Sequence, residues 1–366
     1  MIHIAKPVMG EAEKKAVMAV LDSGMIAQGP AVKRFEEAFA KYIGVKHAVA
    51  TNSGTSALHV ALLASGIGPG DEVIVPAFTF IATSNAVLFT GARPVFADID
   101  ADSFNISVES VKEKITPKTR AVIPVHLYGQ PCDMKELVGL CESRGIRLIE
   151  DACQAHGAEY NGRKAGSFGT GVFSFYPTKN MTASEGGMIT TNDDGVAARA
   201  RTIRNHGQSE RYRHDVLGFN HRMTDVSAAI GMAQLEGLEG MNSRRISNAS
   251  FFSKELAGLE GIKTPSTKEG RKHVFHQYTI RVLSGKRDRL KQFLEEKGIG
   301  SCVYYPITNN RQKLYTDLGY GNESLPASEQ ACKEVLSIPV HPQLGKQELE
   351  AIVSAIKEFC KEGTKR

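Results

Sequence analysis

Lys179 is the residue of this sequence whose surroundings best suit covalent chemistry. It lies in the segment Ser174-Phe175-Tyr176-Pro177-Thr178-Lys179-Asn180, after a β-forming apolar run and a proline turn, with few other charges nearby. A lone lysine is usually a solvated surface charge. A dry setting, however, lowers the pKa of the amine and lets it act as a nucleophile. The segment therefore indicates a reactive lysine, with a surface lysine as the alternative.

Glu150 and Asp151 form a second candidate, at the end of the predicted strand 146–151. Ligands of open α/β sheets bind at the carboxyl ends of the parallel strands. A carboxylate there, partly removed from water, could hold a cationic ring nitrogen. A plain helix or turn cap is the alternative for a lone aspartate.

The third candidate is Asn52-Ser53-Gly54-Thr55-Ser56, between a predicted strand and a predicted helix. Such a turn directs several N–H groups and the positive end of the helix dipole at one point, which suits a phosphate. An ordinary helix N-cap is the alternative. Gly166, Gly169 and Gly171 imitate a dinucleotide-binding fingerprint, but they precede a predicted strand instead of opening a helix, so we do not assign them that role.

These candidates need a sheet to bring them together, and the segment 47–191 predicts one. It alternates short β-rich runs with helical patterns, as repeated βαβ units do. Its strands are apolar on both faces, as strands are when helices cover both sides of a mostly parallel sheet. The sequence thus predicts an α/β protein with a large domain, 1–250, and a smaller C-terminal α+β domain, 251–366.

Helical and strand patterns outside this segment fill in the two predicted domains. The first two helices are expected to pack as an arm outside the sheet, and a basic loop is expected at about 205–220. The predicted elements are helices at 11–22, 30–43, 192–204, 224–259, 286–298 and 345–363, and a strand at 276–282.

Composition excludes several classes of protein. The 366 residues are 42% hydrophobic and carry a net charge of +5 without a block of five like charges, which argues against nucleic-acid binding. Six scattered cysteines without a CxxC pair predict no disulfide framework and no metal site. The N-terminus lacks the apolar core of a signal peptide, and the most apolar window, 73–91, is too polar to span a bilayer. We expect a cytoplasmic protein that does not bind membranes.

The motifs of the chain, in order, resemble a known family. Their order is similar to that in the pyridoxal-phosphate (PLP) enzymes of aminotransferase fold type I. The motifs are SGTSAL, PAFTFIAT, EDACQAHGAEYNG, FSFYPTKN, EGG and GFNHRMTDVSAAIG. The nearest branch resembles the DegT-type nucleotide-sugar aminotransferases. The resemblance extends from about residue 23 to residue 342.

The resemblance implies a role for each site residue. Lys179 would bind the cofactor covalently, and Asp151 would pair with its pyridine nitrogen. The backbone amides of Gly54 and Thr55 and the Ser174 hydroxyl would hold the phosphate. Phe80 would stack on the ring, although a core phenylalanine is the alternative, and Gln154 would bind the ring hydroxyl. Asn220 would reach the phosphate of a neighbouring subunit and so make a homodimer with shared sites, although a turn asparagine is the alternative.

The resemblance also implies the reaction. An amino acid, L-glutamate in our expectation, gives its amino group to the cofactor, and pyridoxamine phosphate then passes it to a keto nucleotide-sugar of amino-sugar and cell-surface polysaccharide biosynthesis. Whether carbon C3 or C4 of the sugar is aminated stays open. Alternatives are a sugar dehydratase of the same family, which would carry histidine in place of Lys179, a cysteine desulfurase using Cys153, and a regulatory protein that binds without catalysis.

Some residues depart from the pattern or stay open. The basic residues of 201–222 fit either a solvated loop or a contact for anionic substrates. Asn309 and Asn310 stand where relatives carry a histidine, which puts in doubt a substrate role for that loop. His156 is expected to line the site without a catalytic role.

Overall fold

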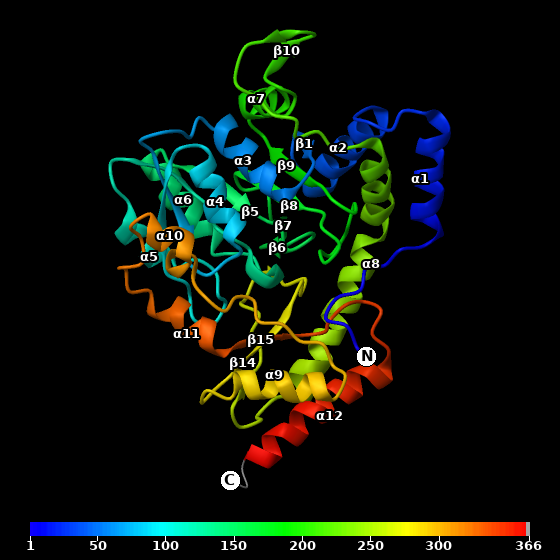
Figure 1. Ribbon diagram of the computed structural model, residues 1–366, viewed down its shortest axis with the longest axis vertical. Coiled ribbons are helices and arrows are strands. Elements are labelled where there is room, and N and C mark those ends of the chain that lie inside the picture. Colours follow the sequence, from blue (N-terminus) through cyan, green and yellow to red (C-terminus); the bar gives the residue numbers. More distant parts are fainter. Residues whose placement is uncertain (364–366) are drawn as a thin grey trace.

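The computed structural model describes residues 1–363, and its centre is a seven-stranded sheet. The strand order is β1-β9-β8-β5-β4-β2-β3, and only β9 runs against the others (Figure 1). The prediction of a mostly parallel sheet is therefore confirmed. The strands are β1 (His47–Thr51), β2 (Glu72–Pro76), β3 (Arg93–Ala97), β4 (Thr119–Val122), β5 (Arg147–Asp151), β8 (Thr170–Ser174) and β9 (Gly187–Thr191).

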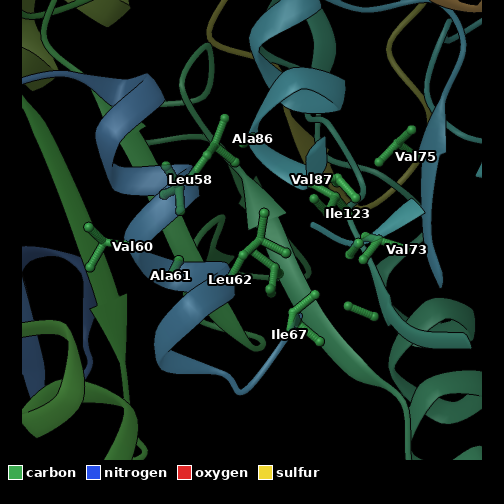
Figure 2. Packing of buried hydrophobic residues seen from close by; sticks show 14 of the residues in the cluster. Leu58, Val60, Ala61, Leu62, Ile67, Val73, Val75, Ala86, Val87 and Ile123 are labelled. Atoms are coloured by element: carbon green, nitrogen blue, oxygen red, sulfur yellow. The ribbon is translucent and has the colours of Figure 1, made fainter. Parts of the chain in front are cut away.

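Helices cover both faces of this sheet because its strands are apolar on both sides. On one face, Leu58 and Leu62 of α3 pack with Val73 and Val75 of β2 and with Val87 of α4 (Figure 2). Neighbouring side chains of the same strands point the other way, into a cluster with α5 and α6. The covering helices are α3 (Gly54–Ala64), α4 (Ile81–Phe89), α5 (Val108–Lys114), α6 (Met134–Arg144) and α7 (Asp194–Arg204).

The N-terminal helices are α1 (Glu11–Ser23) and α2 (Pro30–Ile43), close to their predicted bounds. α1 packs along α8 at the side of the molecule (Figure 1). α2 belongs to the layer that covers the sheet, since its Phe35 and Phe39 are fully buried with residues of β8 and β9. The carboxylate of Asp225 accepts hydrogen bonds from the backbone N–H groups of Gly29, Ala31 and Val32 and so caps α2.

The long helix α8 (Asp225–Glu255) leads from the sheet to the C-terminal part of the chain (Figure 1). This part has its own apolar cluster between α8, a three-stranded sheet and two helices. The predicted boundary at residue 250 falls inside α8, and the division into two domains stays a prediction. The elements here are β12 (Ile262–Lys263), β14 (Tyr278–Val282), β15 (Val335–Ile338), α9 (Arg287–Glu296) and α12 (Lys346–Gly363).

Parts of the C-terminal segment return to the first part of the chain. β13 pairs with β6, and Tyr315 and Leu325 lie in the cluster that contains α3. No helix within residues 1–363 is both long and apolar enough to cross a membrane. The remaining elements are β6 (Glu159–Tyr160), β7 (Arg163–Lys164), β13 (Arg271–Lys272), α10 (Lys313–Asp317), α11 (Pro326–Glu334) and the 3-10 turns η1 (Leu127–Gly129) and η2 (Asn309–Arg311).

The predicted basic loop is a short hairpin that projects from the body near α7 (Figure 1). Its strands are β10 (Gln208–Glu210) and β11 (Arg213–His214). Part of the basic run is structural: Arg204 is buried against Glu36 and the carbonyl of Ala50, and Arg222 donates to Asn205 over 2.8 Å. Tyr212, at the tip, and Leu217, after β11, are exposed.

Candidate active site

A cavity of about 530 Å³ lies at the carboxyl ends of the strands. β5 brings Asp151 to it, β8 brings Ser174, and the turn after β1 brings Gly54. Seven of the eight predicted site residues line this one cavity. They are Gly54, Thr55, Phe80, Asp151, Gln154, Ser174 and Lys179.

Asp151 presents a fixed acceptor in the cavity wall. Its Oδ2 accepts a hydrogen bond of 2.8 Å from the Thr83 hydroxyl, and its Oδ1 accepts one of 3.2 Å from the backbone N–H of Cys153. The residue is buried, yet within residues 1–363 no cation forms an ion pair with it. A buried carboxylate of this kind suits a protonated ring nitrogen.

Glu150, the preceding residue, points away from the cavity and is enclosed. Its carboxylate accepts backbone hydrogen bonds from Gly166 at 2.8 Å, Phe168 at 2.7 Å and Gly169 at 2.9 Å. His126 Nε2 lies 3.1 Å away and donates, because its Nδ1 already accepts from the backbone of Cys132. The glycine loop that imitates a nucleotide fingerprint therefore binds an internal carboxylate.

Lys179 stands in the turn after β8, where its backbone N–H donates to the carbonyl of Tyr176 over 2.9 Å. Burial lowers the pKa of its amine below the ordinary 10.5, although the Cys153 thiol and the Asp151 carboxylate oppose this. Across residues 1–363 its Nζ has no hydrogen-bond or ion-pair partner. A half-buried amine with a lowered pKa is suited to covalent catalysis.

The N-terminus of α3 closes one end of the cavity against Ser174. A Cβ on Gly54 would lie 2.6 Å from the Ser174 Cβ and 3.2 Å from the Cys153 sulfur, so only glycine permits this approach. Ser53 is the N-cap and accepts from the backbone of Ser56 over 3.1 Å. The N-cap and the anion site thus use different atoms, and a phosphate fits beside Gly54, Thr55 and Ser174.

Phe80 and Gln154 occupy other parts of the wall. Phe80 is 54% exposed, with its ring centre 6.1 Å from that of Tyr305. Gln154 is buried and accepts at Oε1 from the backbone of Tyr128 over 2.8 Å, while its Nε2 lies 3.4 Å from the Tyr305 hydroxyl. The residues present therefore fit PLP: an anion cradle, a carboxylate, a free amine and an exposed aromatic ring.

Asn220 is the one predicted site residue outside the cavity. It is exposed at the base of the hairpin, where it bridges to Asn205. Its expected role toward a neighbouring subunit stays a prediction.

Sequence reasoning missed several lining residues. Three loops that lie far apart in the sequence contribute Tyr128, His276, and Tyr304 with Tyr305. Thr83 of α4 does not line the cavity but donates a hydrogen bond to Asp151. Among the missed residues, only Tyr304 and Tyr305 lie close in sequence to residues considered above, Asn309 and Asn310. The other residues reach the cavity through tertiary structure alone.

Three further expectations can be compared with the structure. The expectation that His156 lines the site is wrong: it is buried behind the cavity against Phe173 and Phe175, because these two rings, in β8 and directly after it, point into the protein. Asn309 is buried and donates to the Ser84 hydroxyl over 2.9 Å. Asn310 is fully buried as well. Neither asparagine lines the cavity.

Comparison with known proteins agrees with this geometry. The model of the DegT/DnrJ/EryC1/StrS aminotransferase family matches residues 7–357. A protein of Geobacillus stearothermophilus named pleiotropic regulatory protein is 44% identical, covering 94% of this chain and 95% of its own. The UDP-N-acetyl-3-dehydro-alpha-D-glucosamine 3-aminotransferase of Acidithiobacillus ferrooxidans is 42% identical over 92% and 91% of the two chains.

Solved structures give the same answer. DesV of S. venezuelae, crystallised with a ketimine intermediate, superposes with a TM-score of 0.92 at 40% identity, covering 95% of this chain and 94% of its own. The PLP-form of the sugar aminotransferase Spr1654 from Streptococcus pneumoniae, described as putative, has a TM-score of 0.93 at 29% identity over 99% of both chains. The chain belongs to the DegT/DnrJ/EryC1/StrS aminotransferase family, as the order of its motifs predicted.

Proposed function

We propose that this chain transfers an amino group from L-glutamate to a keto nucleotide-sugar, with PLP as its cofactor. The observation that carries the proposal is the convergence of the Lys179 amine, the Asp151 carboxylate and the N-terminus of α3 in one cavity. Family membership supports the reaction type. The relative from Acidithiobacillus ferrooxidans, named for a UDP-sugar, supports the substrate class.

Each residue has a task that follows from its geometry. PLP, when bound, supplies an aldehyde that amines attack and a ring that withdraws electrons from the reacting carbon. Asp151 holds the ring nitrogen protonated, and the N–H groups at Gly54 and Thr55, with the Ser174 hydroxyl, hold the phosphate. Lys179 Nζ, with its lowered pKa, takes a proton from the substrate carbon and returns it.

Two groups keep the ring in place beside this amine. Phe80, an exposed ring in the cavity wall, stacks on the cofactor ring, and Gln154 orients that ring through its hydroxyl edge. We assign the anionic substrates to the open side of the cavity. No residue of 201–222 lines this cavity, so the exposed basic residues of the hairpin would pair with a diphosphate in the site of the neighbouring chain.

The assembly we propose is a homodimer in the cytoplasm, with Asn220 of each chain serving the site of the other. The exposed position of Asn220 outside its own cavity supports this role. The proposed pathway is amino-sugar biosynthesis for cell-surface polysaccharide, a role that relatives named for spore coat polysaccharide and perosamine support.

The alternatives meet specific obstacles. A dehydratase of this family would lack Lys179. A desulfurase needs a reactive thiolate, but burial raises the pKa of Cys153 well above its ordinary value, and the neighbouring Asp151 adds to this rise. A regulatory protein needs no reactive amine, whereas Lys179 is present here. The name of the relative called a regulatory protein is therefore not enough to replace the aminotransferase proposal.

The test is a transamination assay with the purified full chain and PLP. The protein is incubated with L-glutamate and a panel of keto nucleotide-sugars, and release of 2-oxoglutarate is followed. We expect release with at least one sugar, and borohydride trapping with peptide mapping should label Lys179. A chain that binds PLP but releases no 2-oxoglutarate with any sugar would support the regulatory alternative.

A further inference from the structure

A row of hydrogen-bonded side chains lies directly behind the cavity, and no part of the proposed mechanism uses it. Asn180 follows Lys179 in the chain, Asn242 projects from α8, and His276 lines the cavity from the loop before β14. All three are at least nine-tenths buried. Their hydrogen bonds connect segments that lie far apart in the sequence.

The direction of these hydrogen bonds is dictated by two backbone carbonyls. The carbonyl of His156 can only accept, so the group 2.8 Å from it must be the NH₂ of Asn242. The Asn242 oxygen then accepts from the Asn180 NH₂ over 2.8 Å. That NH₂ also donates to the carbonyl of Val274 over 3.1 Å, which confirms its orientation independently.

Close packing holds this arrangement in place. Gly157 has a φ of +79°, and a Cβ there would lie 2.8 Å from the Asn242 Nδ2. A larger residue at position 157 would therefore displace the first amide of the row.

The last link decides the protonation of His276. The Asn180 oxygen is left as an acceptor and lies 3.3 Å from His276 Nδ1, so Nδ1 must carry the hydrogen. Burial holds the pKa of His276 well below its ordinary value, and the charges of Lys179 and Arg245 lower it further. The ring is therefore neutral, and Nε2 keeps its lone pair. Among residues 1–363, no group donates to that nitrogen.

We propose that His276 is a further residue of the reaction: its Nε2 accepts a hydrogen bond from the substrate's amino group while that group is transferred beside Lys179. This inference rests on the proposed function. Lys179 and His276 both line the cavity, and the His276 ring is held by Asn180, the residue that directly follows Lys179. An acceptor there orients an amine whose lone pair must point at the reacting carbon.

The tautomer can be measured directly, without catalysis. The full chain, with and without PLP, is labelled with ¹⁵N-histidine, and the two ring nitrogens of His276 are assigned by comparison with His276→Gln. We expect a pyrrole-type shift for Nδ1 and a pyridine-type shift for Nε2 by NMR. The opposite tautomer, or a doubly protonated ring at neutral pH, would overturn the proposal.

Kinetics then test the role of the lone pair. In His276→Ala, the single-turnover rate with L-glutamate should fall on the order of 10²-fold, with a small change in KM. Added imidazole should restore part of the loss, and His276→Gln, which keeps an acceptor oxygen, should retain more activity than His276→Ala. The Gln variant keeps the test open if the Ala variant does not fold.

His273→Gln is the matched control. His273 is also a buried histidine, three residues earlier, but it stacks on Phe275 and does not line the cavity. It should keep the wild-type rate and show no response to imidazole.

The outcomes separate this proposal from the proposed function. A wild-type rate in His276→Ala would overturn the amino-group role. A loss confined to the sugar half-reaction would also overturn it and would assign His276 to a sugar hydroxyl. Absence of transamination in the wild-type chain would instead refute the proposed function, while the NMR result would still decide the tautomer.

Discussion

The two carboxylates at the end of β5 are neighbours in sequence but belong to different kinds of region. Glu150 is enclosed by three backbone N–H donors and His126, and it is fully buried. Asp151 faces a cavity with two donors and, among the residues that the structure describes, no cation bonded to it. The alternation of a β-strand sends one side chain into the protein and the other into the site.

This difference shows how to distinguish a polar network that stabilises the fold from one that binds a ligand. Where every acceptor is matched by a donor, as around Glu150, the network stabilises the fold and has no capacity to bind a ligand. Where acceptors and amines remain partly unmatched in a cavity, as at Asp151 and Lys179, the protein has reserved them for a bound group. Substitutions on the two sides should therefore fail in different ways.

The largest effect is expected from Lys179→Ala. Losing the only group that both binds the cofactor covalently and moves the substrate proton should lower kcat by at least about 10³-fold, with little change in folding. Stopped-flow assays and the loss of the absorbance of covalently bound PLP measure this. Lys135→Ala, an exposed lysine of α6, is the control. Retained absorbance in Lys179→Ala would identify another lysine as the covalent site.

Asp151→Asn should reduce kcat by roughly 10²-fold, because a neutral amide no longer holds the ring nitrogen protonated. The free energy of unfolding should hardly change, since no cation within residues 1–363 is bonded to Asp151 and would lose its partner. Steady-state kinetics and urea titration test the two halves of this statement. A large loss of stability with unchanged kcat would place Asp151 with the structural network instead.

Glu150→Gln should lower stability and leave kcat nearly unchanged, the reverse of Asp151→Asn. Its NH₂ would face backbone donors that need an acceptor, so the free energy of unfolding should fall by about 3 kcal/mol. Urea titration measures this, and kcat of the folded fraction should stay within severalfold of wild type. Glu136→Gln, an exposed glutamate of α6, should stay within about 0.5 kcal/mol. Equal stability of the two variants would contradict the enclosed role of Glu150.

The smallest effect is expected from Gly54→Ala, at the phosphate site formed by Gly54, Thr55 and Ser174. In Gly54→Ala the new methyl group would meet Ser174 at 2.6 Å and force α3 away from it, so PLP should bind roughly tenfold more weakly, about 1.4 kcal/mol. Fluorescence titration with PLP measures the Kd. Gly139→Ala, a helical glycine with open space around its Cα, should bind PLP like wild type.

Local pattern was enough to predict most elements of the βαβ region and the motifs whose residues meet in the cavity. The strands of the βαβ region are short apolar runs, and both N-terminal helices carry a clear helical period, so their positions do not depend on distant contacts. Lys179, Asp151 and Gly54 could be named because the order of several motifs is more specific than any one of them.

The remainder depends on tertiary structure. His276 lies 96 residues after the Asn180 that sets its proton, and no spacing rule connects them. The position of His156 behind the cavity follows from how β8 turns its phenylalanines. The sequence pattern also could not predict which of Glu150 and Asp151 faces the cavity, because the side to which each strand residue points is set by what packs on the two faces of the sheet.

The cap of α2 has a consequence for the growing chain. Asp225, which holds the first turn of this helix, is made 196 residues after Gly29. In the described part of the chain, the one strand that pairs with β1 is β9, which follows it by more than a hundred residues. During synthesis the first fifty residues therefore wait for most of the protein to leave the ribosome before they gain their partners. The N-terminal segment should become resistant to protease only after residue 225 has left the ribosome, although it emerges first.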